Sequence, residues 1–314
     1  MRPDDERPLS GLAFAVAGAG RVGASLARWA VAGGARLARV AVHRRRDRAE
    51  ELVGDCAAAG NGAEIVPFDA LASGDLDLLL VAVSDPALDA VAARLAEMPQ
   101  AAVVLHTAGA RGASALAPVA ANGSAAGTLH PLKAFPHVLA DPAEARGVTF
   151  AVDGDEAACR LAERLARTWG GVPQRVPEAQ RDLYHLAATL AAGGVVTMLT
   201  AAERVAGTAG LDPHVLGGYL ELARGAVAGA GEALADQGSF ASAITGPAAR
   251  GDGDTVMRQL AALEAVSPAL ADLAAGVARQ ALAAIATAGR ASDSHRQLLA
   301  RLEARERASA GRPG

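Results

Sequence analysis

The chain has 314 residues, which predicts two domains at about 150 residues each. Its formal net charge of −4 is not the basic footprint of a nucleic-acid-binding protein. Hydrophobic residues make up 51 % of the chain and aromatic residues only 3 %, so the core must consist of alanine, leucine and valine. This composition favours closely packed helices over a β-sandwich.

The first half alternates short apolar strands with helices. Predicted strands cover residues 12–17, 36–43, 63–66, 76–83, 101–105, 124–129, 148–152 and 172–176, and predicted helices cover 22–32, 47–58, 86–98 and 156–169. Residues 76–83 are apolar apart from Asp77, as in a strand that is buried on both faces. The alternation predicts an α/β fold, a Rossmann-type mostly parallel sheet with helices on both faces.

After Pro177 the strand signals stop, and an all-α domain is predicted. Its helices are expected at 178–207, 213–236, 254–264 and 267–307, the last broken near Gly289. We therefore expect a Rossmann domain over 9–177, a helical domain over 178–307 and a disordered tail over 308–314. The apolar stretch 186–202 is interpreted as a buried helix rather than a membrane span, and the charged N-terminus has no apolar signal core. The expected location is cytoplasmic, without a membrane partner.

A glycine motif lies between the first predicted strand and the first predicted helix. It reads Gly18-Ala19-Gly20-Arg21-Val22-Gly23. In a dinucleotide site the first glycine permits the tight turn, the second lets the backbone approach a pyrophosphate, and the third lets the helix pack on the strand. The helix N-terminus then offers N–H groups to the phosphates. The alternative is an ordinary glycine turn.

The end of the second strand predicts which dinucleotide binds. NAD sites place an acid there to hold the ribose 2′-hydroxyl. Here the sequence continues with His43, Arg44, Arg45 and Arg46, and no carboxylate follows until Asp47. Arginines suit the 2′-phosphate of NADP, so His43, Arg44 and Arg45 are assigned to that cofactor. A solvated basic turn is the alternative.

Open α/β sheets bind ligands beyond the carboxyl ends of their strands. Besides the glycine motif, three segments are expected at that edge. They are Val83-Ser84-Asp85, the segment around Thr107, and His130-Pro131-Leu132-Lys133. Val83, Ser84, Asp85 and Thr107 are therefore predicted to contact the cofactor.

Four segments carry a family resemblance. They are residues 106–112 (HTAGARG), 127–135 (GTLHPLKAF), 184–188 (YHLAA) and 245–252 (TGPAARGD). Their order resembles the bacterial Rossmann-like oxidoreductases with a C-terminal helical domain of unknown function, distant relatives of pyrroline-5-carboxylate reductase and ketopantoate reductase. The resemblance implies NADP-linked reduction and a helical domain that forms a homodimer, and it implies no particular substrate. The chain departs from the family at Gly193, where an asparagine is common, and at Lys133, where the family is often uncharged.

Hydride delivery to a carbonyl or imine needs a group that neutralises the charge developing on oxygen or nitrogen. His130, Lys133 and His185 are the catalytic candidates, each weighed against a structural role. Tyr184, Thr189 and Arg250 are the substrate-binding candidates, and Asp252 or Asp254 is expected to cap the helix that follows Arg250. Cys56 and Cys159 have no metal-binding spacing, so no metal is expected.

The sequence hypothesis is an NADPH-dependent reductase acting on a small carbonyl or imine compound with an anionic group. Two alternatives stay open. One is a non-catalytic NADPH-binding dimer that acts as a sensor or scaffold, and the other is a deazaflavin cofactor in place of NADPH.

Overall fold

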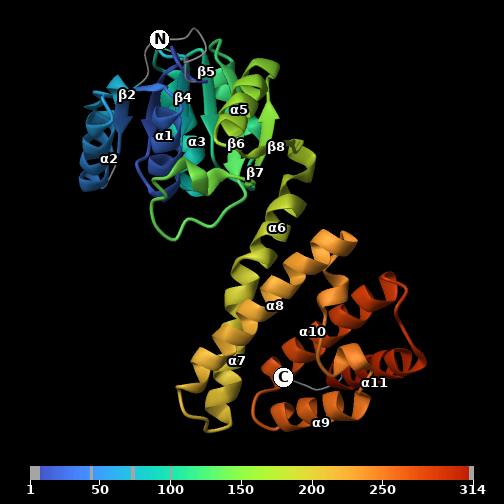
Figure 1. The fold of residues 1–314 in the computed structure, drawn as a ribbon. Helices are drawn as coiled ribbons and strands as arrows, with labels where there is room; N and C mark the ends of the chain where they lie inside the picture. The colour runs from blue at the N-terminus through green and yellow to red at the C-terminus, as the bar shows by residue number, and fades with distance from the viewer. Residues whose placement is uncertain (1–7, 43–44, 72–74, 100, 311–314) are drawn as a thin grey trace. The chain divides into compact units, whose positions relative to one another are not determined.

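The computed structural model describes residues 8–42, 45–71, 75–99 and 101–310 (Figure 1). The chain divides into two compact units, residues 1–192 and residues 193–314. Each unit has its own architecture and is described separately.

The first unit contains one eight-stranded sheet with the order β3-β2-β1-β4-β5-β6-β7-β8. The strands are β1 (Ala13–Ala17), β2 (Arg36–Ala41), β3 (Glu64–Ile65), β4 (Leu78–Val81), β5 (Val103–His106), β6 (Ala125–Pro131), β7 (Thr149–Gly154) and β8 (Val172–Arg175). Neighbouring strands are parallel except β6 and β7. The mostly parallel Rossmann-type sheet is thus confirmed. Its order reverses between β1 and β4, and crevices that bind ligands form at such a reversal.

Helices cover both faces of this sheet (Figure 1). The helices of this unit are α1 (Arg21–Ala32), α2 (Arg46–Ala58), α3 (Asp85–Ala96), α4 (Ala117–Ala120), α5 (Glu156–Thr168) and α6 (Arg181–Ala191). One hydrophobic cluster joins α1, α2 and α5 to one face through Trp29, Phe150 and Trp169. A second joins α3 and α4 to the other face through Leu88 and Val119. The strands buried on both faces explain the apolar run at 76–83.

The second unit is helical. Its elements are α7 (Gly193–Thr208), α8 (Val215–Gln237), α9 (Gly253–Glu264), α10 (Pro268–Thr287) and α11 (Asp293–Ala310), with short 3₁₀ turns η5 (Phe240–Ala243) and η6 (Ala248–Arg250). A small core that includes Val256, Leu282 and Leu298 joins α9, α10 and α11. The predicted break near Gly289 is confirmed, because this glycine has φ +69° between α10 and α11. The Asp252 side chain accepts a hydrogen bond from Thr255 N at 3.1 Å and caps α9.

The segment after Pro177 differs from the prediction of one buried helix. The structure has a 3₁₀ turn, η4 (Glu178–Gln180), then α6, and then α7 after a break at Ala192. Leu186 and Leu190 are 53 % and 64 % exposed, so the prediction of burial was wrong for this chain taken alone. Residues 178–208 and α10 are both long and apolar enough to cross a membrane by length and composition, a test that core helices of non-membrane proteins also pass.

The predicted domain limits differ from the contacts in two places. Strands end at Arg175, near the predicted boundary at 177, but the compact unit extends to Ala192 because α6 attaches to the sheet through Arg181 and Tyr184. At the other end α11 continues to Ala310, so residues 308–310 are helical rather than disordered. Residues 311–314 lie outside the described residues.

Candidate functional site

The glycine motif forms the turn that its spacing predicts. Gly18 has φ +102°, and a Cβ there would lie 2.5 Å from the carbonyl oxygen of Ala82. A Cβ on Gly23 would lie 2.1 Å from the Gly18 oxygen, so any side chain would force α1 away from β1. Space around the Cβ position of Gly20 is open for 4 Å. The first and third glycines are therefore steric requirements of the fold, and the second leaves room for a ligand.

The amino end of α1 offers unpaired donors. Gly20 is its N-cap residue, so no side chain caps the helix, and its first turn contains no acidic residue. The first N–H groups of a helix have no partner within the helix. An anion beyond Gly20 would receive these donors and the positive end of the helix dipole.

A cavity of about 570 Å³ opens at this helix end. It is lined by Gly20, Arg21, Val22, Arg48, Ala82, Val83, Ser84, Asp85, Thr107, Ala108, Gly109, His130, Pro131, Lys133, Phe135 and His185. The structure thus brings together the four segments that were expected beyond the strand ends, and it adds Arg48, Phe135 and the first part of α6.

The arginines after β2 lie differently from the expectation. His43 and Arg44 fall outside the described residues. Arg45 is 60 % exposed and pairs with Asp47 at 2.7 Å, and this arginine lowers the pKa of the Asp47 carboxyl. Arg48, one turn further along α2, lines the cavity instead, and its guanidinium has no ion-pair partner among the residues that the structure describes. Helical spacing from residue 45 could have indicated this residue.

His130 is held by a hydrogen bond to a tyrosine. Its Nδ1 lies 2.9 Å from the Tyr184 hydroxyl, and the two rings meet edge to face at 5.6 Å. Burial lowers the pKa of His130 to about 4, and the charges of His185, Arg181 and His106 add to this effect. His130 is therefore neutral at neutral pH. Burial also raises the pKa of Tyr184, so the hydroxyl keeps its proton and can donate it to Nδ1.

His185 and His130 converge on Gly109. A Cβ on Gly109 would lie 2.5 Å from His185 Nδ1 and 2.7 Å from His130 Nε2. Only a glycine lets both imidazoles pack against the backbone at this point. His185 Nδ1 is buried without a hydrogen-bond partner. Two ring nitrogens thus meet at one wall of the cavity.

His106, at the end of β5, is a further histidine of this site that no motif had predicted to have a role. It is fully buried, its Nε2 lies 2.9 Å from the Gly112 oxygen, and its Nδ1 accepts from Ala108 N at 3.2 Å. These partners require the neutral tautomer with the proton on Nε2. Burial lowers the pKa of His106 to about 4. Its role is to hold the loop that carries Thr107 and Gly109.

The remaining candidates are dispersed. Lys133 lines the cavity and pairs with Glu144 at 3.2 Å, so its charge is already balanced. Tyr184 contacts His130 and is absent from the lining residues. Thr189 is exposed and donates to the His185 oxygen at 3.0 Å. Arg250 lies in the second unit at the end of η6. Thr189 is not among the residues that line this cavity, and the substrate roles of Thr189 and Arg250 stay predictions.

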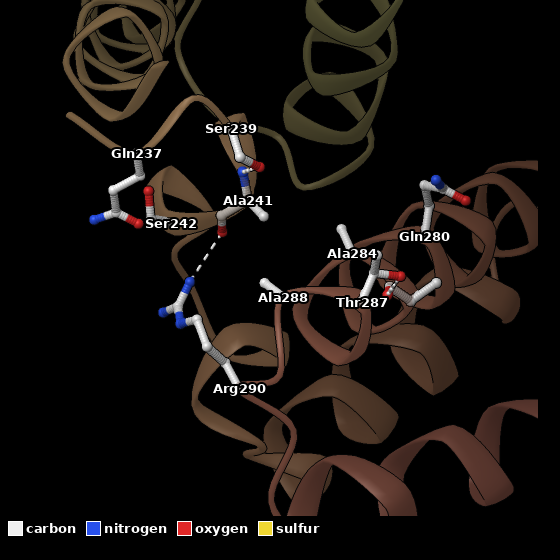
Figure 2. Close-up of a pocket in the computed structure, with 10 residues that line it drawn as sticks. Gln237, Ser239, Ala241, Ser242, Gln280, Ala284, Thr287, Ala288 and Arg290 are labelled. Atoms are coloured by element: carbon white, nitrogen blue, oxygen red, sulfur yellow. Dashed lines mark hydrogen bonds between the residues drawn. The ribbon is translucent and has the colours of Figure 1, made fainter. Parts of the chain in front are cut away.

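A second cavity, of about 560 Å³, lies in the second unit (Figure 2). Several of its polar groups bond to the chain's own backbone: Arg290 to the Ala241 oxygen, Thr287 to the Ala283 oxygen, and Ser239 to Ala241 N. Its lining residues include no carboxylate, histidine or cysteine. Among the described residues of the whole chain, no group of three or more metal-binding side chains occurs. Of these two cavities, only the first is lined by histidines and a carboxylate.

Family comparisons agree with this architecture. Residues 3–131 match the model of a Rossmann-like domain. Residues 148–281 match a domain of unknown function, DUF2520. The chain combines a Rossmann-like domain with a DUF2520 domain. The resemblance drawn from the motifs is thereby confirmed. Comparison with curated protein sequences finds no match.

Several solved structures share the fold. A Thermotoga maritima protein aligns with a TM-score of 0.67 and 20 % identity over 88 % of this chain and 100 % of its own. A candidate NADP oxidoreductase from Bacteroides fragilis gives a TM-score of 0.67 and 20 % identity over 86 % and 97 %. An imine reductase from Myxococcus stipitatus, in complex with NADP⁺, gives 0.57 and 18 % over 92 % and 99 %. At these identities the comparison establishes the fold of this Rossmann–DUF2520 chain.

Proposed function

We propose that this Rossmann–DUF2520 chain is an NADPH-dependent reductase. The observation that carries the proposal is the uncapped amino end of α1, which opens at Gly20 into a cavity containing Arg48 and two histidines. The open space at Gly20 fits a diphosphate. An NADP oxidoreductase and an imine reductase with NADP⁺ are the names printed for proteins of the same fold, which supports this choice of cofactor.

Each part of the cavity has a place in this proposal. The α1 N–H groups and Gly20 would hold the pyrophosphate, and Arg48 would hold the 2′-phosphate. NADPH supplies hydride when it is bound. Val83, Ser84 and Thr107 also line the cavity and would contact the bound cofactor.

His130 is the proposed proton-handling group. With Tyr184 donating to Nδ1, the neutral imidazole carries its own proton on Nε2 and presents an N–H donor near Gly109. Such a donor can bond the oxygen or nitrogen of the substrate and neutralise the charge that develops there. His185 adds a second ring nitrogen at the same wall. Lys133 would bind an anionic substrate group by exchanging the Glu144 carboxylate for it.

Binding calorimetry tests the cofactor. The wild type is expected to bind NADPH more tightly than NADH. Arg48→Ala should weaken NADPH binding about ten- to hundredfold, because a charge-assisted hydrogen bond contributes about 1.5–3 kcal/mol, and should leave NADH binding unchanged. Arg46→Ala is the matched control, since Arg46 lies in the same helix, is exposed and pairs with Glu50. Equal affinity for NADPH and NADH in the wild type would contradict the assignment.

Turnover tests the reaction. Small oxo acids and cyclic imines are each incubated with the protein and NADPH. Oxidation of NADPH is followed by the loss of absorbance of its reduced nicotinamide. At least one anionic substrate should turn over, and Lys133→Met should raise its KM. Tight NADPH binding without any turnover would favour the sensor or scaffold instead. Titration with a deazaflavin in parallel tests the other cofactor.

We also propose that the chain forms a homodimer through its helical domain. Leu222, Val227 and Val196 on α8 and α7 are 71 %, 60 % and 63 % exposed, an unusual density of bare aliphatic side chains. Light scattering should give a dimer mass, and Leu222→Glu with Val227→Glu should give a monomer. Val172→Glu, at a 55 % exposed position on β8, is the control. A monomeric wild type at micromolar concentration would refute the dimer.

A further inference from the structure

The most deeply buried charge near the cavity belongs to Arg181, the first residue of α6. Its side chain is 1 % exposed. Nε donates to the Val176 oxygen at 3.2 Å, and Nη2 donates to the Thr128 hydroxyl. Nη1 is buried without a partner. The guanidinium therefore lies against β6 at Thr128, two residues before His130.

No carboxylate neutralises this guanidinium within the described part of the chain at ion-pair distance. The charged and titratable groups around it are Asp153 on β7, Glu178 on η4, Tyr184 on α6 and Cys159 on α5. Glu178 itself bonds Ser114, and Asp153 forms no ion pair with Arg181. Burial lowers the pKa of Arg181, but a guanidinium keeps its proton in proteins. A cation buried without an ionic partner lowers the stability of the folded chain.

Two histidines and a tyrosine lie close enough to Arg181 to be affected by its positive charge. His106 on β5 and His130 on β6 both experience it, as does the Tyr184 hydroxyl. His185 faces His130 from α6, with ring centroids 6.0 Å apart. The charges that act on His130 are those of His185, Arg181 and His106, and all three groups are basic.

We propose that Arg181 is a positioning residue that keeps the His130–Tyr184 pair in one protonation state, a neutral imidazole bonded to a neutral phenol. Its fixed positive charge opposes a second proton on His130. The same charge stabilises the Tyr184 oxygen if that oxygen gives its proton to Nδ1 while Nε2 passes its own proton to a substrate heteroatom. In that transfer Tyr184 loses one proton, the substrate gains one and His130 changes tautomer. The proton transfer to a substrate rests on the proposed reductase function, whereas the effect of Arg181 on the protonation of His130 does not.

Nuclear magnetic resonance titration of histidine-labelled protein tests the inference without cofactor or substrate. Arg181→Met removes the charge and keeps an unbranched apolar side chain, an exchange that buried ions often tolerate. Arg181→Lys retains the charge and loses the planar fork. The His130 signal, assigned with His130→Gln, should titrate near pH 4 in the wild type and in Arg181→Lys. In Arg181→Met its midpoint should rise by about one unit, the lower end of the effect of a neighbouring charge.

A purely structural Arg181 predicts a different pattern. The midpoint of His130 would then be the same in Arg181→Met and Arg181→Lys, which would overturn the proposal. If Arg181→Met does not fold, the wild type gives the answer, because the Arg181 Cζ signal should shift with the same midpoint as His130. An Arg181 signal that ignores this titration would also overturn it. Absence of reductase activity would count against the proposed function and leave these titrations unaffected.

Discussion

Acidification should destabilise the sheet unit well before its carboxylates titrate. His106 and His130 have pKa values lowered from 6.5 to about 4, chiefly by burial. The unfolded chain binds these protons more tightly than the folded chain, so stability is complete above pH 6.5 and falls as the pH drops from 6.5 towards 4. One pKa unit corresponds to about 1.4 kcal/mol, so each histidine accounts for about 3 kcal/mol over the whole range and about 2.5 kcal/mol by pH 4.5.

Urea unfolding measures this loss. Trp29 and Trp169 are the two tryptophans of the chain and both are buried in the sheet unit, so their fluorescence reports on the unit that contains the histidines. The free energy of unfolding should fall by about 5 kcal/mol between pH 7 and pH 4.5. Lowered carboxyl pKa values, such as that of Glu163 beside Arg175, act only at more acidic pH.

His106→Gln isolates the contribution of one histidine. The variant loses a titrating group and part of the loop support, so it should be less stable at pH 7 but lose only about half as much stability on acidification. A wild type with equal stability at pH 7 and pH 4.5 would refute the neutral, buried state of both histidines. An unchanged slope in His106→Gln would refute it for His106 alone.

Three further variants address the site and the helical unit. Gly109→Ala places a Cβ 2.5 Å from His185 Nδ1, so turnover should fall at least tenfold while NADPH binding changes little. Unaffected turnover would show that the packing of His130 and His185 against residue 109 is dispensable. Tyr184→Phe removes the hydrogen-bond partner of His130 Nδ1, so kcat should fall about tenfold or more while the calorimetric affinity for NADPH stays the same. If the variant keeps the kcat of the wild type, the His130–Tyr184 pair takes no part in proton transfer. Asp252→Ala removes the cap of α9 and should lower the stability of the helical unit by about 1 kcal/mol, with Asp252→Asn as the conservative control in circular dichroism melts.

The positions of the strands and helices could be predicted from the sequence because the residue patterns that mark them have local causes. Apolar runs such as 76–83 mark strands covered on both faces, and Gly18 and Gly23 mark a turn that tolerates no side chain. Placement of four segments at one cavity followed from the rule for the carboxyl ends of parallel strands. What the apolar stretch 186–202 packs against was not predictable in the same way. The same apolar composition suits a helix that faces a core, a membrane or a second chain.

Side-chain partners decide the roles that sequence patterns leave open. Arg45 follows β2 closely in the sequence, yet Asp47 occupies its guanidinium. Arg48, three residues after Arg45, is the arginine of this segment that lines the cavity. Lys133 is the only lysine of the chain, yet Glu144 balances its charge.

The role of Arg181 could not be predicted from its local sequence either. An arginine at the start of a helix is normally a surface residue, and nothing in its local sequence announces a buried cation. Its contacts come from Val176 and from Thr128, which lies 53 residues away and pairs in the sheet with Asp153. Only the assembled sheet and α6 bring a fixed positive charge close to His130. The protonation state of this site is therefore a property of the tertiary fold rather than of any motif.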